Sequence, residues 1–212
     1  MAATLSRRRR RDNPLTRPPQ TAYASSVMSH VFDPKRLHEI ARTAVGLPHE
    51  PMVKTVVDAL RAEYSTHIAP SPRWVINRAG GAMGMMLLLH GSLSEYVLLF
   101  GTPIGTEGYS GRYRMDIWDF VLAGDMWTYT EDAIAERVVT GPGEAAHLGR
   151  DQAKGYRLPD ACWMLEYGRG PVVTMLPFGL SESLVAVDLT TIWRTLAVYA
   201  PLVVRELRQG KI

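Results

Sequence analysis

The stretch Ala79–Tyr113 reads AGGAMGMMLLLHGSLSEYVLLFGTPIGTEGYSGRY, and it decides the fold of this chain. It is apolar and rich in glycine, and its residues alternate with the period of two that is typical of strands. The alternation gives two sets of same-face residues: Met86, Leu88 and His90 in one segment, and Tyr96, Leu98 and Phe100 in the next. Each face combines large apolar groups with one hydrogen-bonding group. This pattern indicates either an ordinary β core or the wall of an apolar ligand pocket.

The composition predicts one folded domain with an appendage. The chain has 212 residues, of which 46% are hydrophobic, so it can bury a sizeable core and is not generally disordered. Cys162 is the only cysteine, which excludes an internal disulfide and a cysteine-based metal site. Residues 1–27 contain six arginines and one aspartate, whereas the remaining residues contain 18 basic and 20 acidic side chains. The folded part is therefore slightly acidic, and we do not expect it to bind nucleic acid.

Residues 1–27 are predicted to be a disordered, arginine-rich tail, and residues 28–212 to be the domain. The arginine run could bind acidic lipid or nucleic acid or act as an address. A solvated tail, or a translation start upstream of Met28, is the interpretation we favour. The longest uncharged run, Ala79–Ser94, is shorter than the roughly 20 apolar residues of a spanning helix. We therefore expect any membrane contact to be peripheral.

The domain is predicted to contain helices over residues 28–70, strands over 71–176 and two apolar helices over 177–212. Asp33 and Pro34 form a typical helix start, and Pro201 would bend or interrupt the last helix. The C-terminal helices carry more apolar residues than one core-facing stripe needs. They either cap the β core or lie on a lipid surface. Three histidines in the helical region lack metal-ligand spacing and are predicted to lie at the surface: His38, His49 and His67.

Two acids fall where a strand pattern predicts apolar surroundings. Alternation from Tyr113 to Val121 places Ile117 and Asp119 on one face, and the segment WMLEY (163–167) carries Glu166. A buried carboxyl is costly unless it is paired or protonated, so Asp119 is either part of a structural pair or chemically used. These two acids are the acid/base candidates. The polar, basic segment Gly149–Asp160 is predicted to be a surface loop.

Four motifs are similar to those of a known family: HGSLSEYVLLFGTPIG (90–105), EGYSGRY (107–113), GPGEA (141–145) and WMLEYGRG (163–170). In this order they resemble the sterol C-8 isomerase and sigma non-opioid receptor family, from about Val31 to the C-terminus. The resemblance implies an α+β fold, with a cupin-like β-barrel around one occluded hydrophobic cavity. It also implies two C-terminal amphipathic helices that cover the cavity and rest on a membrane. A homotrimer, with Gly80, Gly81 and Gly84 near the contacts, is a further implication.

The resemblance assigns the acidic pair to Glu166 and Asp119. Its pocket positions match seven residues: Met86, Leu88, Tyr96, Leu98, Phe100, Tyr113 and Ile117. His90, on the same predicted face as Met86, completes the expected ligand-binding set. The implied enzyme moves a sterol double bond from C8=C9 to C7=C8 by acid/base chemistry through a carbocation. Which carboxyl is the acid stays open.

The alternative is a non-catalytic protein that binds cationic amphiphiles or lipids. Neither function requires a metal or an organic cofactor. The expected location is a membrane surface, in the cytoplasm or at the endoplasmic reticulum. Two departures from the family pattern stand out: an arginine-rich tail replaces the N-terminal membrane helix, and Gly149–Asp160 contains an insertion relative to the receptor branch.

Overall fold

The computed structural model describes residues 30–211. The predicted tail over residues 1–27 lies outside the described residues. Two helices come first, α1 (Pro34–Arg42) and α2 (His49–Tyr64). The carboxylate of Asp33 accepts a hydrogen bond of 3.0 Å from the Lys35 N–H, and Pro34 occupies the first turn. The helix start predicted at Asp33 is therefore confirmed.

In the described part of the chain, ten strands form two antiparallel sheets. The six-stranded sheet joins, in spatial order, β1 (Trp74–Ala79), β2 (Ala82–Gly91), β3 (Glu95–Thr102), β10 (Cys162–Arg169), β5 (Asp116–Ala123) and β8 (Ala145–Leu148). The four-stranded sheet joins β4 (Thr106–Tyr109), β9 (Lys154–Leu158), β6 (Met126–Thr130) and β7 (Val138–Thr140). Two short 3₁₀ turns, η1 (Glu131–Ala133) and η2 (Val172–Thr174), lie between strands or lead into the last helices.

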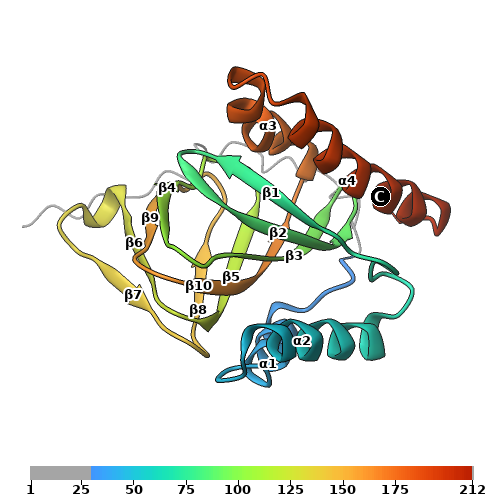
Figure 1. The fold of residues 1–212 in the computed structure, drawn as a ribbon, viewed down its shortest axis with the longest axis horizontal. Helices are drawn as coiled ribbons and strands as arrows, with labels where there is room; N and C mark the ends of the chain where they lie inside the picture. Colours follow the sequence, from blue (N-terminus) through green and yellow to red (C-terminus); the bar gives the residue numbers. More distant parts are fainter. Residues whose placement is uncertain (1–29, 212) are drawn as a thin grey trace, which may run out of the picture.

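The α+β class, the antiparallel β core and the positions of the helices are confirmed. The expected barrel is not closed, because among residues 30–211 each sheet pairs only within itself and ends in two edge strands. The fold is thus two stacked sheets with helices on both sides (Figure 1).

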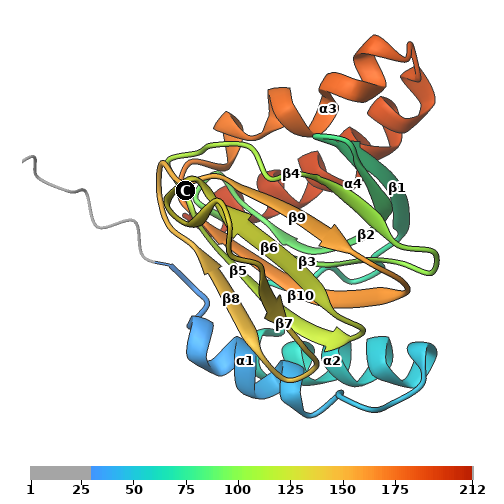
Figure 2. The same cartoon turned by 90° about the vertical axis from the view of Figure 1, so that its left-hand side faces the viewer.

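Alternation in the central strands separates two environments. One set of side chains packs against α1 and α2 in a continuous core that includes Leu87, Val97, Leu99, Phe120 and Leu165. Burial of each such side chain contributes about 1.5–3 kcal/mol. The other set faces the four-stranded sheet and the C-terminal helices α3 (Leu176–Val185) and α4 (Leu189–Arg208). Figure 2 shows the two helical pairs on opposite sides of the β layers.

The β1–β2 hairpin explains the glycine motif. Gly80 and Gly81 connect Ala79 to its partner Ala82 with φ of +61° and +88°, the left-handed pair that a type I′ turn requires. A Cβ atom on Gly80 would lie 2.2 Å from the Tyr109 carbonyl oxygen and 2.6 Å from the Phe178 ring. Glycine therefore lets the hairpin approach both β4 and α3 closely.

The C-terminal helices close the side of the molecule that faces away from α1 and α2. Asp188 caps α4 by accepting a hydrogen bond from the Thr191 N–H, and α4 continues through Pro201. Of the helices in residues 30–211, none combines the length and the apolar character needed to cross a membrane.

Candidate active site

A cavity of about 210 Å³ lies between the two sheets and under the C-terminal helices. Its wall is mostly apolar and draws on nearly every strand and both helices. The residues that line it include Met86, Leu88, Tyr96, Leu98, Phe100, Ile117, Asp119, Lys154, Tyr156 and Glu166. A concave apolar space with a few convergent polar groups is the usual form of a small-molecule site.

The two predicted acids meet in this wall. Glu166 on β10 is the direct cross-strand partner of Asp119 on β5. In an antiparallel sheet, directly opposite residues on one face have their Cβ atoms about 4.5–5.5 Å apart. Leu165 and Phe120, the neighbours of opposite parity, face the α1–α2 core instead. The register of β5 and β10 thus builds a carboxyl pair into the cavity.

Glu166 is set up to hold a proton near neutral pH. Burial, and next the charge of Asp119, raise its pKa to about 7. The Tyr96 hydroxyl donates a 2.6 Å hydrogen bond to Glu166 Oε1, and this bond and Lys154 partly oppose the rise in pKa. Burial and the Glu166 charge also raise the pKa of Tyr96 well above its usual value, so the phenol keeps its proton. Glu166 Oε2 remains available to a bound molecule.

Asp119 is paired with a residue that the sequence did not indicate. The Lys154 ammonium donates to Asp119 Oδ2, and the two side chains are only 10% and 5% exposed. The prediction of a surface loop over Gly149–Asp160 is wrong for residues 154–158, which form β9. The alternation of Lys154, Tyr156 and Leu158 is the pattern that could have predicted this strand. Polar neighbours on both sides concealed it.

Six of the eight predicted ligand-binding residues line the cavity: Met86, Leu88, Tyr96, Leu98, Phe100 and Ile117. Tyr113 is not among the lining residues, although it packs against Phe178, whose ring does line the cavity, with ring centroids 5.6 Å apart. The C-terminal helices supply lining residues that strand periodicity could not reveal, among them Phe178 and Tyr199.

His90 lies on the other side of the sheet. The register of β2 against β3 shifts between Leu88, which pairs with Leu98, and His90, which pairs with Val97. The irregularity inserts one residue, so the simple alternation from Met86 fails at this point. His90 is fully buried and packs edge-on against Phe32, with ring centroids 4.8 Å apart. The prediction that it shares a face with Met86 and Leu88 is therefore corrected.

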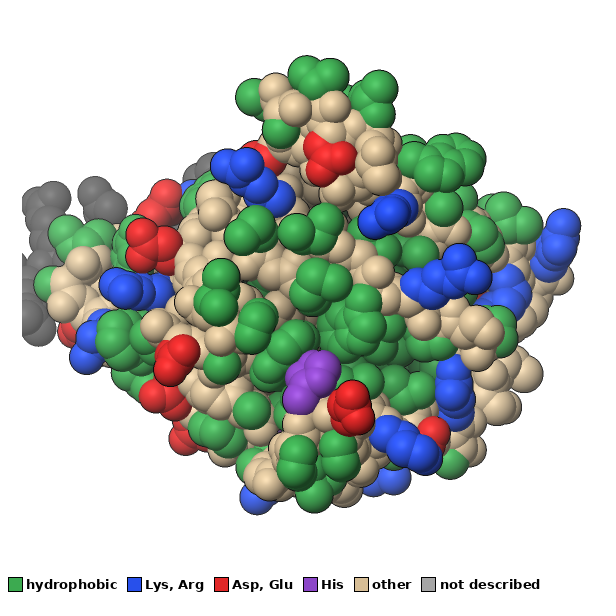
Figure 3. Space-filling model, viewed as in Figure 1, with side chains coloured by type: hydrophobic (Ala, Val, Ile, Leu, Met, Phe, Trp, Pro, Cys, Tyr) green, Lys and Arg blue, Asp and Glu red, His purple; other side chains and the backbone are tan. Residues whose placement is uncertain are grey.

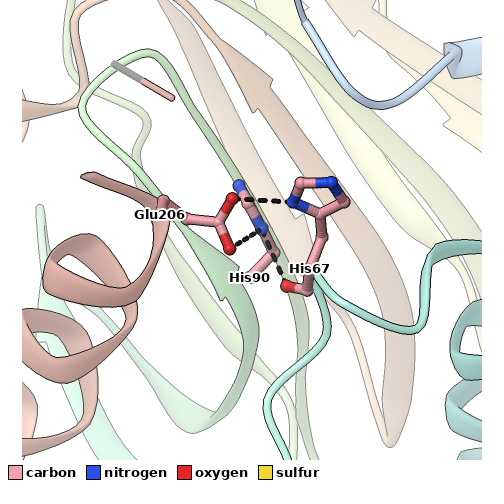
Figure 4. Close-up of side chains that lie close together, drawn as sticks. All are labelled: His67, His90 and Glu206. Atoms are coloured by element: carbon pink, nitrogen blue, oxygen red, sulfur yellow. Dashed lines mark hydrogen bonds and ion pairs between the residues drawn. The ribbon is translucent and has the colours of Figure 1, made fainter. Parts of the chain in front are cut away.

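His90 belongs to a cluster with His67 and Glu206 (Figure 4). The prediction of a surface position for His67 is also corrected, because its Nδ1 lies 2.7 Å from Glu206 Oε2 in a partly buried setting. His90 Nδ1 donates to the His67 carbonyl oxygen at 2.9 Å, and burial lowers the pKa of His90 to about 4. None of the three residues lines the cavity.

Histidine and glutamate are zinc ligands, and one candidate ligand atom of each of the three residues lies within 4.8 Å of the others. The Arg205 guanidinium donates to the His67 carbonyl oxygen at 2.6 Å and lies 3.4 Å from Glu206 Oε1. The two carboxylate oxygens of Glu206 thus already have partners, His67 Nδ1 on Oε2 and the Arg205 guanidinium on Oε1. We assign the cluster a structural role, in which it fastens α4 to the segment between α2 and β1.

Comparison with known proteins adds to this geometry. Residues 20–211 match the family model described as ERG2 and Sigma1 receptor like protein. A C-8 sterol isomerase from Pyricularia oryzae is 39% identical over 188 residues, which cover 86% of this chain and 85% of that protein. Sigma non-opioid intracellular receptor 1 from Gallus gallus is 39% identical over 171 residues, covering 79% and 77%. Among solved structures, an RmlC-like cupin from Shewanella frigidimarina matches with a TM-score of 0.38 and 17% identity, covering 47% of this chain and 85% of that one.

Proposed function

Because this chain belongs to the ERG2 and Sigma1 receptor like protein family, we propose that it is an isomerase that moves a sterol double bond from C8=C9 to C7=C8. The observation that carries the proposal is the carboxyl pair, buried Asp119 and partly buried Glu166, in the wall of an apolar cavity. The pKa of Glu166 is raised to about 7, so this carboxyl can hold a proton near neutral pH, whereas Asp119 lies beside an ammonium group. The pair therefore offers a proton donor and a proton acceptor on one face of one sheet.

The proposed reaction needs two proton transfers. Glu166 donates its proton to C9, which breaks the C8=C9 π bond and leaves a cation at C8. The C7–H bond then breaks, its electron pair forms C7=C8, and a carboxylate oxygen of Asp119 accepts the proton. A proton next to a carbocation is very acidic, so a carboxylate held by an ammonium is a sufficient base. Return of the proton from Asp119 to Glu166 restores the site.

The cavity wall supports the cationic intermediate. After the first transfer Glu166 is ionised and faces the positive charge in surroundings from which water is largely excluded, where opposite charges interact strongly. The ring faces of Tyr96, Phe100 and Tyr156, all in the wall, add aromatic surface that a cation favours. The Tyr96 hydroxyl, which already donates to Oε1, stabilises the new carboxylate.

The direct experiment is incubation of the purified protein with a Δ8-sterol, followed by analysis of the sterol products. We expect a Δ7-sterol from the wild type and none from Glu166→Gln, which keeps the size of the side chain but cannot donate a carboxyl proton. The matched control is Glu63→Gln on α2, whose carboxylate pairs with Arg36 at the surface. A wild-type protein that forms no Δ7 product would refute the proposal.

The alternative is non-catalytic binding of cationic amphiphiles, and the similarity to the Gallus gallus receptor supports it. The same carboxyl pair would bind an ammonium group in the apolar cavity. Tight amine binding together with absent turnover would favour this alternative. We regard the enzyme as the better-supported function, because several relatives at 35–39% identity are named as C-8 sterol isomerases.

We also propose that the C-terminal helices rest on a membrane surface. Five apolar residues near the α3–α4 connection are between 57% and 86% exposed: Leu184, Val185, Val187, Leu189 and Trp193. Figure 3 shows hydrophobic side chains at the outer end of this helical layer. An exposed cluster of this kind fits an interfacial contact, which would bring the cavity close to lipid-dissolved sterol.

The homotrimer and the location at the endoplasmic reticulum rest on the resemblance and remain proposals. Light scattering of the purified protein tests the trimer, and microscopy of the tagged protein tests the location.

A further inference from the structure

Within residues 30–211, Lys154 is the one lysine in the wall of the cavity, and its backbone is held by hydrogen bonds. Its N–H donates to the Ser110 hydroxyl at 2.9 Å, and its carbonyl oxygen accepts from the Ser110 N–H at 3.0 Å. The next residue, Gly155, leaves room for the Tyr129 ring, which a Cβ atom would meet at 2.3 Å. The ammonium group is thereby directed from the four-stranded sheet toward Asp119 on the six-stranded sheet.

The ion pair is expensive to bury. Removing a lysine and a carboxylate from water costs several kcal/mol for each ion, and well-packed apolar side chains often replace such pairs without loss of stability. A pair that only joined two sheets would not need a position in the wall of a ligand cavity. Its place beside Glu166 instead points to a role in the chemistry of the site.

We propose that Lys154 is a positioning residue that holds the Asp119 carboxylate in an ion pair and so leaves Glu166 as the proton donor. This inference rests on the proposed isomerase function. Two carboxyls alone would share one proton, and either could carry it. An ammonium in contact with Asp119 Oδ2 removes that ambiguity, because it pairs directly with the carboxylate of Asp119, whereas Glu166 Oε1 accepts a hydrogen bond from the neutral Tyr96 hydroxyl. It also favours return of the C7 proton from Asp119 to Glu166 after each turnover.

The same charge makes the cavity selective against cationic ligands. With Asp119 and Lys154 paired and Glu166 protonated, the resting cavity carries no net charge, which suits a neutral sterol. Without Lys154, the carboxyl pair would carry at least one uncompensated negative charge. A unit charge in a partly buried site changes the affinity for an ion by about tenfold or more. Lys154 thus favours the neutral substrate over an amine.

The test compares Lys154→Met with Lys154→Arg, which keeps the charge, and with Lys54→Met, a control at an exposed lysine on α2. For Lys154→Met we expect kcat to fall by at least about tenfold. We also expect the alkaline limb of its pH–rate profile to move upward, because Lys154 lowers the pKa of Glu166. Affinity for the probe amine dimethyldodecylamine should rise about tenfold or more, with affinity for a neutral ether of equal chain length unchanged. Arginine should restore most of the turnover, and Lys54→Met should behave like the wild type.

Thermal unfolding of each variant separates loss of fold from loss of chemistry, and only folded variants are compared. If folded Lys154→Met keeps the wild-type kcat, pH profile and amine affinity, the ion pair only joins the sheets and the proposal is overturned. If the wild type itself forms no Δ7 product, the proposed function fails. The amine measurement then still decides whether Lys154 sets the charge of the cavity, and an unchanged affinity overturns that role too.

Discussion

Replacing Tyr96 with phenylalanine tests the assignment of Glu166 as the acid through its pKa. The change removes the hydroxyl that donates to Glu166 Oε1 at 2.6 Å and keeps the aromatic ring. A hydrogen bond to a charged group is worth about 1.5–3 kcal/mol and one between neutral groups about 0.5–1.5 kcal/mol. The carboxylate form of Glu166 therefore loses about 1–1.5 kcal/mol more than the protonated form. This difference corresponds to an upward pKa shift of roughly one unit, since one unit is about 1.4 kcal/mol.

The assay is the initial rate of Δ8-to-Δ7 conversion between pH 5 and pH 10. The protonated form of Glu166 is the active one, so the rate falls as pH rises through its pKa of about 7. For Tyr96→Phe the alkaline limb should move to roughly pH 8. Tyr199→Phe is the matched control, because Tyr199 also lines the cavity but donates to the Ser92 carbonyl oxygen. If the alkaline limb of Tyr96→Phe stays in place or moves to lower pH, the Tyr96 hydroxyl does not lower the pKa of the catalytic acid, and Glu166 is not that acid.

Three further predictions concern stability and membrane contact. The pKa of Glu166 is raised by folding from its usual value to about 7, so its contribution to stability is present at low pH and is lost as pH rises through 7. The free energy of unfolding of Glu166→Gln, measured with urea, should therefore rise by up to roughly 3 kcal/mol relative to that of the wild type between pH 4.5 and pH 8.5. If the free energies of unfolding of both proteins depend equally on pH, the pKa of Glu166 is not raised by folding. Glu95 is fully buried and accepts hydrogen bonds from Val31, Tyr167 and Lys211, so Glu95→Gln should lower the free energy of unfolding by about 3 kcal/mol. Asp58→Asn, which breaks the exposed pair with Lys54, should cost less than about 1 kcal/mol, and equal losses in the two variants would contradict the role of burial. The double variant Val187→Ser with Trp193→Ser should weaken sedimentation with phosphatidylcholine vesicles several-fold. The control Ile134→Ser changes an exposed apolar residue that does not belong to α3 or α4, and it should sediment like the wild type. Loss of binding in both would show that the contact is not specific to the helices.

Local patterns were sufficient for much of the fold and for the carboxyl pair. Alternation placed Asp119 and Glu166 on apolar strand faces, and the cap at Asp33 fixed the start of α1. The period of two also identified six cavity residues, because β2, β3 and β5 are regular there. The same rule failed at His90, where one inserted residue reverses the parity of β2 against β3.

Lys154 shows why the remaining features of the site and the fold could not be predicted from the sequence. Its partner Asp119 lies 35 residues earlier in the chain and in the other sheet, so no local spacing links the two. The surrounding polar residues predicted a loop, whereas pairing with β4 and β6 makes residues 154–158 a strand. The prediction of a closed barrel was wrong for a similar reason, because closure depends on contacts between edge strands, and the sequence of each strand does not specify these contacts.

The central claim is that Glu166 donates a proton to C9 of a sterol in this cavity. A single turnover of a Δ8-sterol, with the enzyme in excess and equilibrated beforehand in D₂O, is the decisive measurement, because the carboxyl proton of Glu166 has then exchanged with solvent. We expect the wild type to form a Δ7-sterol that carries one solvent-derived deuterium at C9, and Glu166→Gln to form no such product. A Δ7-sterol without deuterium at C9, or full turnover by Glu166→Gln, would contradict it.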